Sequence, residues 1–303
     1  MWTKENIPDL TGKTAIVTGG NTGIGYETVK ALYEKGANVI LAARDKKKAN
    51  EAVRNIQKTI KSAGNLEIGL LNLSNLSQIK TFAEDFKKNH TQLDILINNA
   101  GVMIPPASKT DDGFELQFGV NFLGHFALTA HLIPPLNNAS NAKIVTLSSG
   151  AATLTDGIDF ENLRLEKPYN EWLSYAVSKL ADILFTYELD RKLKEGGSNI
   201  ISVAAHPGVT RTDLQRHIPE LQLEGMLAEY SEVMKPWQGA LPSLFAATDP
   251  SVKGGEFFGP DGEKEFSGYP AISKHSTSAM NNQQLAQKLW TYAEKASNLR
   301  FNI

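Results

Sequence analysis

The sequence predicts an α/β fold in which a parallel sheet carries helices on both faces. Short runs rich in β-branched residues alternate with longer segments of helical periodicity along the whole chain of 303 residues. No linker, low-complexity segment or internal repeat interrupts this alternation, so we expect a single domain over residues 1–303. In addition, the polar and glycine-rich motifs follow the expected strands, which places them at one edge of the sheet.

The composition is that of a soluble globular protein, with 41% hydrophobic and 21% charged residues. A net charge of −2 gives no general attraction to nucleic acid or to anionic membranes. The absence of cysteine excludes disulfides, thiolate catalysis and cysteine-ligated zinc. We find neither the apolar core of a signal peptide at the N-terminus nor an apolar run of about 20 residues, and therefore expect a cytoplasmic protein without a membrane span.

The expected elements follow one another at the spacing of βαβ units. The expected strands are Thr14–Thr18, Asn38–Ala42, Glu67–Asn72, Leu93–Ile97, Lys143–Leu147, Ile200–Ala204 and Glu256–Phe258. The expected helices are Gly23–Lys35, Lys46–Ser62, Leu76–Lys88, Gly113–Ile133, Trp172–Lys194 and Pro236–Ala247. Adjacent strands that are joined by a helix run parallel. The carboxyl ends of these strands, which the motifs follow, therefore lie at the same edge of the sheet.

A glycine-rich turn, TGGNTGIG, follows the first strand and leads directly into a helix. Glycines in this position permit a tight turn and let the backbone approach a pyrophosphate at the helix N-terminus. The spacing differs from the G-x-G-x-x-G fingerprint, and a turn without a ligand is the alternative. Its place within the first βαβ unit favours dinucleotide binding. The residues expected to bind are Gly19, Asn21, Thr22, Gly23, Ile24 and Gly25.

The end of the second strand distinguishes between the two nicotinamide dinucleotides. A carboxylate there would bind a ribose 2′-hydroxyl, whereas an arginine accommodates a 2′-phosphate. The strand is followed by Arg44, whose planar guanidinium suits phosphate. Lys46–Lys48 add positive charge, although such a run is also typical of a solvated helix face, and Asp45 is a contrary signal. We predict NADP(H), with NAD(H) the less favoured cofactor.

Three further motifs end strands at the same edge of the sheet. NNAG occupies Asn98–Gly101, the pair Ser148 and Ser149 follows the fifth strand, and HPGVTRT occupies His206–Thr212. Each of these is also found as an ordinary turn or strand end. Their convergence on one edge is more informative than any one of them.

A tyrosine and a lysine are four residues apart in the expected helix WLSYAVSKLA, Trp172–Ala181. At this spacing Tyr175 and Lys179 share a helix face. The ammonium favours the phenolate, so we predict that it lowers the pKa of Tyr175 towards neutrality, where the phenol can donate or accept a proton. The alternative is a packed aromatic residue beside a solvated lysine, and the pair alone favours that alternative.

Taken together and in this order, the glycine turn, NNAG, the serine after the fifth strand, Tyr-x-x-x-Lys and Pro-Gly resemble the short-chain dehydrogenase/reductase family. The resemblance runs from Thr11 to at least Thr212. SKLADILFTYELDRKL and HPGVTRTDL are most similar to the retinol-dehydrogenase-like branch and its bacterial relatives. The family implies a Rossmann fold, a doubly wound seven-stranded sheet of order 3-2-1-4-5-6-7, and hydride exchange between a nicotinamide cofactor and a carbonyl or alcohol.

The resemblance assigns four catalytic roles. Tyr175 corresponds to the family's proton donor and acceptor, and Lys179 to the residue that tunes it and binds the nicotinamide ribose. Ser149 corresponds to the serine that orients the substrate carbonyl, in preference to Ser148. Asn121, within VNFLGHF, corresponds to the helix asparagine that holds a water in the proton relay.

The resemblance also extends the expected cofactor site. Asn99–Gly101, including Ala100, would line the adenosine ribose, and Val209 and Thr212, after Pro207 and Gly208, would bind the carboxamide. Where the family usually has an aspartate for the adenine amino group, this chain has Asn72 before Leu73. An amide oxygen can still accept that hydrogen bond, so we expect adenine binding to persist.

Two segments are expected to shape the substrate side, and a third follows the family core. Asp156–Trp172 is an insert that would form part of a substrate wall, and Asp213–Lys235 is the expected lid. His217, within that lid, is expected to be a surface residue. An extension over residues 260–303 is expected to contain a helix near Gln283–Ala296. The apolar lid residues that suggest a hydrophobic substrate, or alternatively an ordinary core, are Leu214, Ile218, Leu221, Leu223, Met226 and Leu227.

Three alternatives to a carbonyl reductase remain at this level. An extended-type dehydratase or epimerase normally carries G-x-x-G-x-x-G, which this chain lacks, and a light-dependent protochlorophyllide reductase needs a cysteine. The third is a non-catalytic NADP-sensing module, because a fold alone does not establish activity. The family's dimer, in which the helices bearing Asn121 and Tyr175 pair, is a further expectation that the C-terminal extension could modify.

Overall fold

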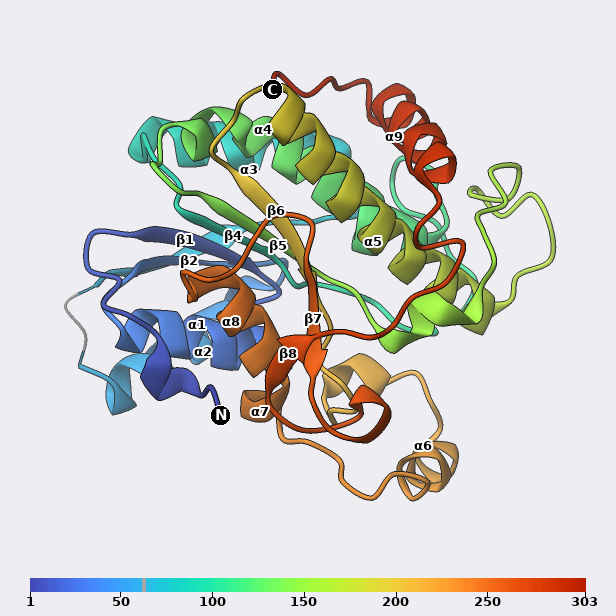
Figure 1. Cartoon of the computed structure of the whole chain (residues 1–303), viewed down its shortest axis with the longest axis horizontal. Coiled ribbons are helices and arrows are strands. Elements are labelled where there is room, and N and C mark those ends of the chain that lie inside the picture. Colours follow the sequence, from blue (N-terminus) through green and yellow to red (C-terminus); the bar gives the residue numbers. More distant parts are fainter. Residues whose placement is uncertain (62–63) are drawn as a thin grey trace.

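The computed structural model describes residues 1–61 and 64–303, and over these residues it contains one eight-stranded sheet between layers of helices (Figure 1). The strand order is β3-β2-β1-β4-β5-β6-β7-β8. The first seven strands are parallel and β8 pairs antiparallel with β7. The strands are β1 (Thr14–Thr18), β2 (Asn38–Ala43), β3 (Leu66–Leu70), β4 (Ile95–Asn98), β5 (Lys143–Leu147), β6 (Ile201–Ala205), β7 (Phe257–Pro260) and β8 (Pro270–Ile272).

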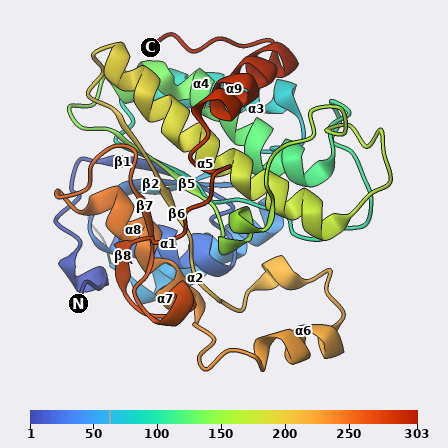
Figure 2. The same ribbon diagram turned by 45° about the vertical axis from the view of Figure 1, so that its right-hand side comes forward.

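The helices divide between the two faces of the sheet, as Figures 1 and 2 show. Helices α1, α2 and α8 cover one face, and α3, α4 and α5 cover the other. The helices are α1 (Gly23–Glu34), α2 (Lys46–Thr59), α3 (Leu76–Asn89), α4 (Gly124–Asn137), α5 (Glu171–Glu195), α6 (Glu220–Leu227), α7 (Pro236–Gly239), α8 (Leu241–Thr248) and α9 (Gln283–Ser297). This arrangement confirms the doubly wound fold and the predicted order of the seven parallel strands.

The strands are buried on both faces because their side chains alternate between two apolar cores. In β1, Ala15 and Val17 pack with the α1 and α2 layer, while Ile16 packs with the α4 and α5 layer. Burial of such an aliphatic side chain contributes about 1.5–3 kcal/mol. The two cores fix the register of the strands and therefore the edge at which their carboxyl ends meet.

Most predicted elements are found with their ends shifted by one or two residues, whereas three predicted helices differ by more. The predicted helix Gly113–Ile133 is instead a π-helix over Phe118–Leu123 followed by α4. The predicted helix Pro236–Ala247 is divided into α7 and α8, because Pro242 has no N–H to continue the hydrogen-bond ladder. The predicted helix Lys46–Ser62 ends at Thr59, and its last predicted residue lies outside the described residues.

Strand β8 was not predicted from the sequence. It is only three residues long and contains a proline, so it carries no recognisable strand pattern. It pairs with β7 after a turn in which the backbone carbonyl of Tyr269 accepts the N–H of Asp261. The turn of this hairpin therefore lies at the carboxyl edge of the sheet, and β8 leads the chain back away from that edge (Figure 1).

The C-terminal helix α9 packs on α4 and α5 through an aromatic cluster. The Trp290 ring lies 5.2 Å from that of Phe126 and 6.1 Å from that of Phe185, and Phe301 is 4.6 Å from Trp290. Figure 2 shows α9 lying against these helices. The extension therefore covers part of the surface formed by the two helices whose pairing was expected in a dimer.

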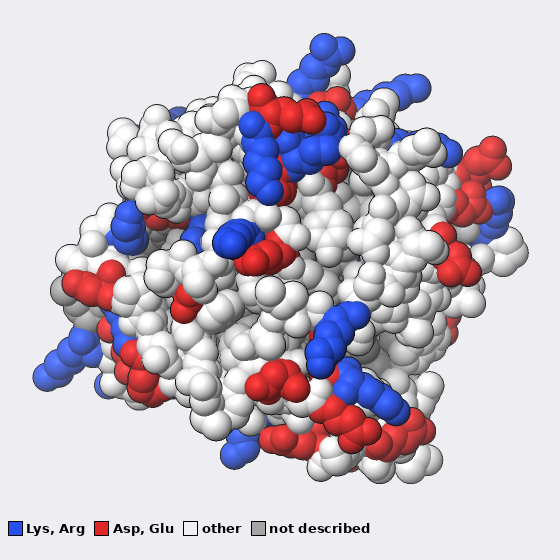
Figure 3. Space-filling model, viewed as in Figure 1, with Lys and Arg blue, Asp and Glu red and all other residues white. Residues whose placement is uncertain are grey.

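The face seen in Figure 3 carries lysine and arginine side chains interspersed with aspartate and glutamate. This mixing agrees with the net charge of −2. None of the helices in the described ranges combines the length and apolar character needed to cross a membrane.

Candidate active site

A cavity of about 1230 Å³ opens at the carboxyl edge of the sheet. Its walls come from the glycine turn after β1, the ends of β2, β4, β5 and β6, and the segment that contains α6. Every residue predicted to bind cofactor lines it, and so do Ser149, Tyr175 and Lys179. Asn121 is the one predicted site residue that does not reach the cavity wall.

The glycine turn needs glycine at specific positions. Gly19 and Gly23 have φ values of +66° and +54°, in the left-handed region that disfavours other residues. At Gly25, an added Cβ would lie 2.3 Å from the carbonyl oxygen of Gly19 and 2.5 Å from the amide nitrogen of Asn99. The turn thus brings bare backbone to the cavity at the first residues of α1, where free N–H groups and the helix dipole favour an anion.

We expect Gly25→Ala to lower the free energy of unfolding by about 1–3 kcal/mol, since the methyl group would overlap backbone that cannot move away. Denaturant unfolding of the purified variant measures this loss. Gly157→Ala is the matched control, because no atom lies within 4 Å of a Cβ added there. Equal losses in the two variants would contradict the close packing of the turn.

The end of β2 presents Arg44 and Asp45 to the cavity, and the Asp45 carboxylate also caps the next helix. Asp45 is the N-cap of α2, and its Oδ1 accepts the backbone N–H groups of Lys47 and Lys48 at 2.9 and 3.1 Å. Arg44 is exposed and lines the cavity. The contrary acidic signal in the sequence is therefore explained by helix capping.

A buried hydrogen-bond chain ties the NNAG segment to α4. The Nδ1 of His125 donates to the carbonyl of Asn121 (2.7 Å), so Nε2 accepts from the hydroxyl of Thr18 (2.8 Å). That hydroxyl oxygen in turn accepts the N–H groups of Asn99 and Ala100, both at 2.9 Å. Complete burial lowers the pKa of His125 to about 4. The sequence pattern around His125 does not predict this role, because the partner Thr18 lies 107 positions away.

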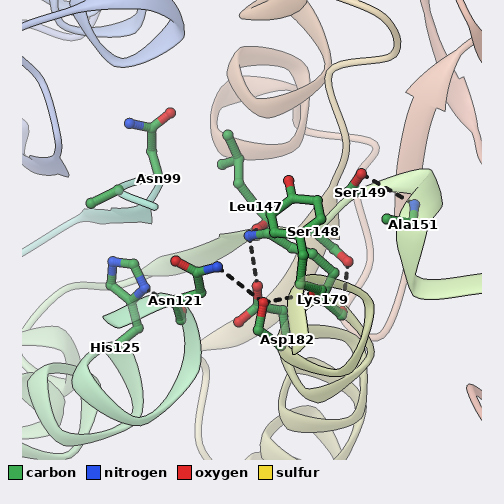
Figure 4. Close-up of polar contacts among 12 residues, drawn as sticks. Asn99, Asn121, His125, Leu147, Ser148, Ser149, Ala151, Lys179 and Asp182 are labelled. Carbon is green, nitrogen blue, oxygen red and sulfur yellow. Dashed lines mark hydrogen bonds and ion pairs between the residues drawn. The ribbon is translucent and has the colours of Figure 1, made fainter. Parts of the chain in front are cut away.

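The side chain of Asn121 is fully engaged inside the protein. Its amide nitrogen donates to the carbonyl of Val102 and to the Ser178 hydroxyl, both at 3.0 Å, and its oxygen accepts the N–H of Val102 at 2.8 Å. Asn121 lies in the π-helix, a distortion often found near functional sites. The Asn121 side chain therefore joins the segment after β4 to α5. Figure 4 shows Asn121 beside the α5 residues Lys179 and Asp182.

The two serines after β5 have different environments. The Ser148 hydroxyl donates to the carbonyl of Lys179 at 2.8 Å and is buried, so it joins β5 to α5. Ser149 lines the cavity, where its hydroxyl accepts the N–H of Ala151 at 3.2 Å. The structure thus brings together Ser149, Tyr175 and Lys179, with the ammonium 5.9 Å from the centre of the tyrosine ring.

The prediction that the pKa of Tyr175 is lowered is wrong, because its net shift is upward. Burial raises the pKa of Tyr175 above its usual value, while the charge of Lys179 and the nearby Ser149 hydroxyl act to lower it. Lys179 therefore acts in the predicted sense, but desolvation of the phenolate outweighs it. The periodicity of a helix face carries no information about depth below the surface, so this effect of burial could not be predicted from it.

The model of the short chain dehydrogenase family matches residues 13–222. The chain belongs to the short-chain dehydrogenase/reductase family. Human retinol dehydrogenase 14 is 37% identical over 300 residues, covering 93% of this chain and 85% of the relative. Human retinol dehydrogenase 11 is 45% identical over 240 residues, covering 78% and 73%. The predicted family and its retinol-dehydrogenase-like branch are confirmed, and the chain is an oxidoreductase that acts on CH–OH groups.

Solved structures agree with this membership. An uncharacterised protein from Mycobacterium paratuberculosis is 34% identical with a TM-score of 0.82, covering 100% of this chain and 99% of that one. A short chain dehydrogenase from Burkholderia cenocepacia, solved in complex with NADP, has a TM-score of 0.66 at 24% identity. That likeness covers 82% of this chain and 96% of the other and supports the fold.

The substrate side of this short-chain dehydrogenase differs from the prediction in two respects. Leu221 is 89% exposed and points away from the cavity, whereas the other five apolar lid residues line it. Of the insert Asp156–Trp172, only Trp172 lines the cavity. His217 is exposed at the cavity rim, as predicted for a surface residue.

The rest of the insert packs against the chain before α4 and does not reach the substrate side. The Arg164 guanidinium lies over the Phe114 ring at 3.7 Å, and the Tyr169 hydroxyl donates to the carbonyl of Pro105 at 3.0 Å. These contacts explain why a segment that joins β5 to α5 does not form the predicted wall.

Asn72 lies at the expected place, but its amide oxygen is already engaged. It accepts the backbone N–H and the hydroxyl of Ser74 at 3.2 and 2.8 Å. An amide oxygen has two lone pairs, and Ser74 already occupies both of those of Asn72. To bind the adenine amino group as predicted, this oxygen would have to accept a third hydrogen bond.

A cluster behind the Pro207–Gly208 turn was not found from the sequence. His206 and Glu265 bond at 2.7 Å, and the Nε2 of His275 lies 3.8 Å from the same carboxylate. The N–H of Gly208 donates to Nδ1 of His206, so Nε2 carries the proton that faces Glu265. A metal ion would require a lone pair there, and the cluster therefore fits a hydrogen-bonded support for the turn better than a metal site.

Proposed function

We propose that this chain is an NADP(H)-dependent oxidoreductase that interconverts an apolar carbonyl compound and its alcohol, with Tyr175 as the general acid and base. The observation that carries the proposal is the meeting of Ser149, Tyr175 and Lys179 in one cavity with the glycine turn. Family membership supplies the class of reaction, and this arrangement supplies groups suited to its proton transfer.

The residues that would hold the cofactor fit a dinucleotide. The positive φ values at Gly19 and Gly23 and the crowding at Gly25 leave backbone, rather than side chains, facing the cavity at the start of α1. Asn99–Gly101 and Val209 with Thr212 lie along the same cavity wall, where the adenosine ribose and the carboxamide would bind. When bound, the nicotinamide supplies or accepts the hydride.

In the reductive direction, the Tyr175 hydroxyl donates its proton to the carbonyl oxygen of the substrate, and in oxidation the phenolate takes the proton back. The Ser149 hydroxyl donates a hydrogen bond to the same oxygen, so two donors stabilise the developing alkoxide. Lys179 offers positive charge to the phenolate and an N–H to the nicotinamide ribose. The amide of Asn121 is committed to Val102 and Ser178, so a relay water would have to use the carbonyl of Asn121, which already accepts from His125.

The preference for NADP(H) rests on Arg44, which lines the cavity at the end of β2, while the carboxylate of Asp45 at the same wall is engaged as a helix cap. We expect Arg44→Ala to lower kcat/KM with NADPH by about tenfold or more and to leave NADH nearly unchanged, because a charge-assisted hydrogen bond to phosphate is lost. Kinetics with each cofactor measure this. Lys47→Ala is the control, since Lys47 has the same charge but does not line the cavity; an unchanged NADPH preference in Arg44→Ala would refute the assignment.

An apolar substrate is supported by the lid. Leu214, Leu223, Met226 and Leu227 line the same cavity as Tyr175, and so does Trp172. A panel of carbonyl compounds and alcohols, including retinoids as one apolar class, assayed with both cofactors, tests the proposal. Turnover of apolar members supports it, whereas tight NADPH binding without turnover across the panel would favour the non-catalytic sensor.

A further inference from the structure

Lys179 forms a buried ion pair with Asp182, a residue to which the family resemblance assigns no role. The Oδ2 of Asp182, one turn further along α5, lies 2.9 Å from its Nζ. The same Nζ donates to the carbonyl of Leu147 at 2.8 Å, as Figure 4 shows. An ammonium has three N–H donors, so one remains for the cavity. The carboxylate therefore lies directly behind the group that is proposed to act on Tyr175.

The pair is buried, with side-chain exposures of 6% for Lys179 and 1% for Asp182. The other carboxylate oxygen, Oδ1, is buried and has no hydrogen-bond partner among the described residues. The neighbouring side chains of β4 and β5 on this face, Asn98 and Thr146, are uncharged. A charge buried in this way acts strongly on its neighbours because little water screens it.

Two titratable groups interact with Asp182, and a third lies near its lysine partner. Lys179 and Tyr175 interact with it from α5 itself, whereas His125 on α4 is kept neutral by burial and feels the charge of Lys179. Within the described residues, Lys179 is the one cation that acts on Asp182. Any change in the charge of Asp182 is therefore felt first by Lys179 and then by Tyr175.

We propose that Asp182 is a positioning residue that sets how much positive charge Lys179 presents to Tyr175. The inference rests on the proposed function of Tyr175 and Lys179. An ionised Asp182 holds the ammonium and partly cancels its field at the phenol, so Tyr175 keeps its proton to higher pH. A neutral side chain at position 182 leaves the full charge of Lys179 to favour the phenolate.

The carboxyl group is suited to this role because its charge changes close to neutral pH. Burial raises the pKa of Asp182 to about 7, against the opposing effect of Lys179. Removal of the carboxylate should therefore matter most above neutral pH, where the wild-type group is ionised. Below that range the wild type and a neutral variant should behave alike.

Asp182→Asn tests the proposal, because the amide keeps the shape of the side chain and removes its charge. The ionisation of Tyr175 is followed by the near-ultraviolet absorbance of tyrosinate in the NADP⁺ complex, and the signal is assigned by its loss in Tyr175→Phe. We expect the midpoint to move to lower pH by about one unit in Asp182→Asn, a tenfold change in the phenolate fraction. The alkaline limb of kcat/KM for carbonyl reduction should move in the same direction.

Asp190→Asn is the matched control. Asp190 is also buried on α5, is also paired with a lysine, Lys194 at 2.6 Å, and also has an unpartnered Oδ1, but it lies away from the cavity. Its variant should leave the Tyr175 midpoint unchanged. Equal midpoints in the wild type and a folded Asp182→Asn protein would overturn the proposal, as would an equal shift in Asp190→Asn.

Two further arms keep the test decisive. If Asp182→Asn does not fold, Asp182→Ser removes the same charge with a smaller polar side chain, and the same shift is required of it. If no substrate is turned over by any variant, the proposed function fails, yet the tyrosinate titration still reports whether Asp182 acts on Tyr175. The two failures are therefore distinguishable.

Discussion

Tyr175→Phe is expected to reduce turnover by a factor of about 10³ or more while leaving NADPH binding nearly unchanged. The variant removes the one hydroxyl that can exchange a proton with the substrate oxygen, but it keeps the ring and its packing. Tyr175 is 7% exposed and lines the cavity together with Ser149. Turnover is measured as NADPH oxidation, and binding as the change in NADPH fluorescence.

Tyr187→Phe is the control for this experiment. Tyr187 lies on the same helix, three turns after Tyr175, and is partly buried but does not line the cavity. Tyr187→Phe should retain normal turnover. A loss of turnover found only in Tyr175→Phe is then due to the missing hydroxyl of Tyr175 and not to a disturbed helix. A pure Tyr175→Phe protein with wild-type turnover would remove Tyr175 from the proposed mechanism.

The sequence predicted the edge of the sheet at which the cavity lies, for a simple geometric reason. Parallel strands end at the same side, so any motif that follows a strand is brought to that side without knowledge of side-chain packing. The glycine turn, Asn99, Ser149 and Pro207 were all placed in this way, and all line the cavity. The choice of Ser149 over Ser148, which came from the resemblance, agrees with their different hydrogen bonds.

What the sequence could not supply depends on contacts between distant segments. Asp182 looks like an ordinary charged residue on an amphipathic helix until β5 and α4 bury it. His206 and Glu265 are 59 positions apart and meet only because the β7–β8 hairpin folds back onto the turn after β6. The pKa of Tyr175 is likewise decided by its depth below the surface, which local periodicity does not report.

The protonation of His125 is expected to make the protein lose stability in mild acid. Burial holds the pKa of His125 at about 4 in the folded state, below its ordinary value of 6.5. Because the folded-state pKa is the lower one, the stabilising contribution is complete above pH 6.5 and is lost as the pH falls from there to about 4. The difference corresponds to about 3 kcal/mol of unfolding free energy.

The structural consequence of that protonation is specific. In the folded protein the Thr18 hydroxyl donates to Nε2 of His125 and accepts the N–H groups of Asn99 and Ala100. A proton on Nε2 would make that nitrogen a donor, so the hydroxyl would lose its acceptor and this arrangement would break. The segment expected to line the adenosine ribose would loosen together with the protein's core. Binding of NADPH should therefore weaken over the same pH range in which stability falls.

His125→Asn tests this linkage, since an asparagine keeps a donor near Nδ1 but cannot be protonated in this range. Denaturant unfolding at a series of pH values should show a lower stability at neutral pH and a clearly flatter dependence between pH 6.5 and 4. Some dependence should remain, because burial also lowers the pKa of His206. His131→Gln, a half-buried histidine of the same helix, should keep most of the wild-type slope. An unchanged slope in His125→Asn would show that acid destabilises the protein elsewhere.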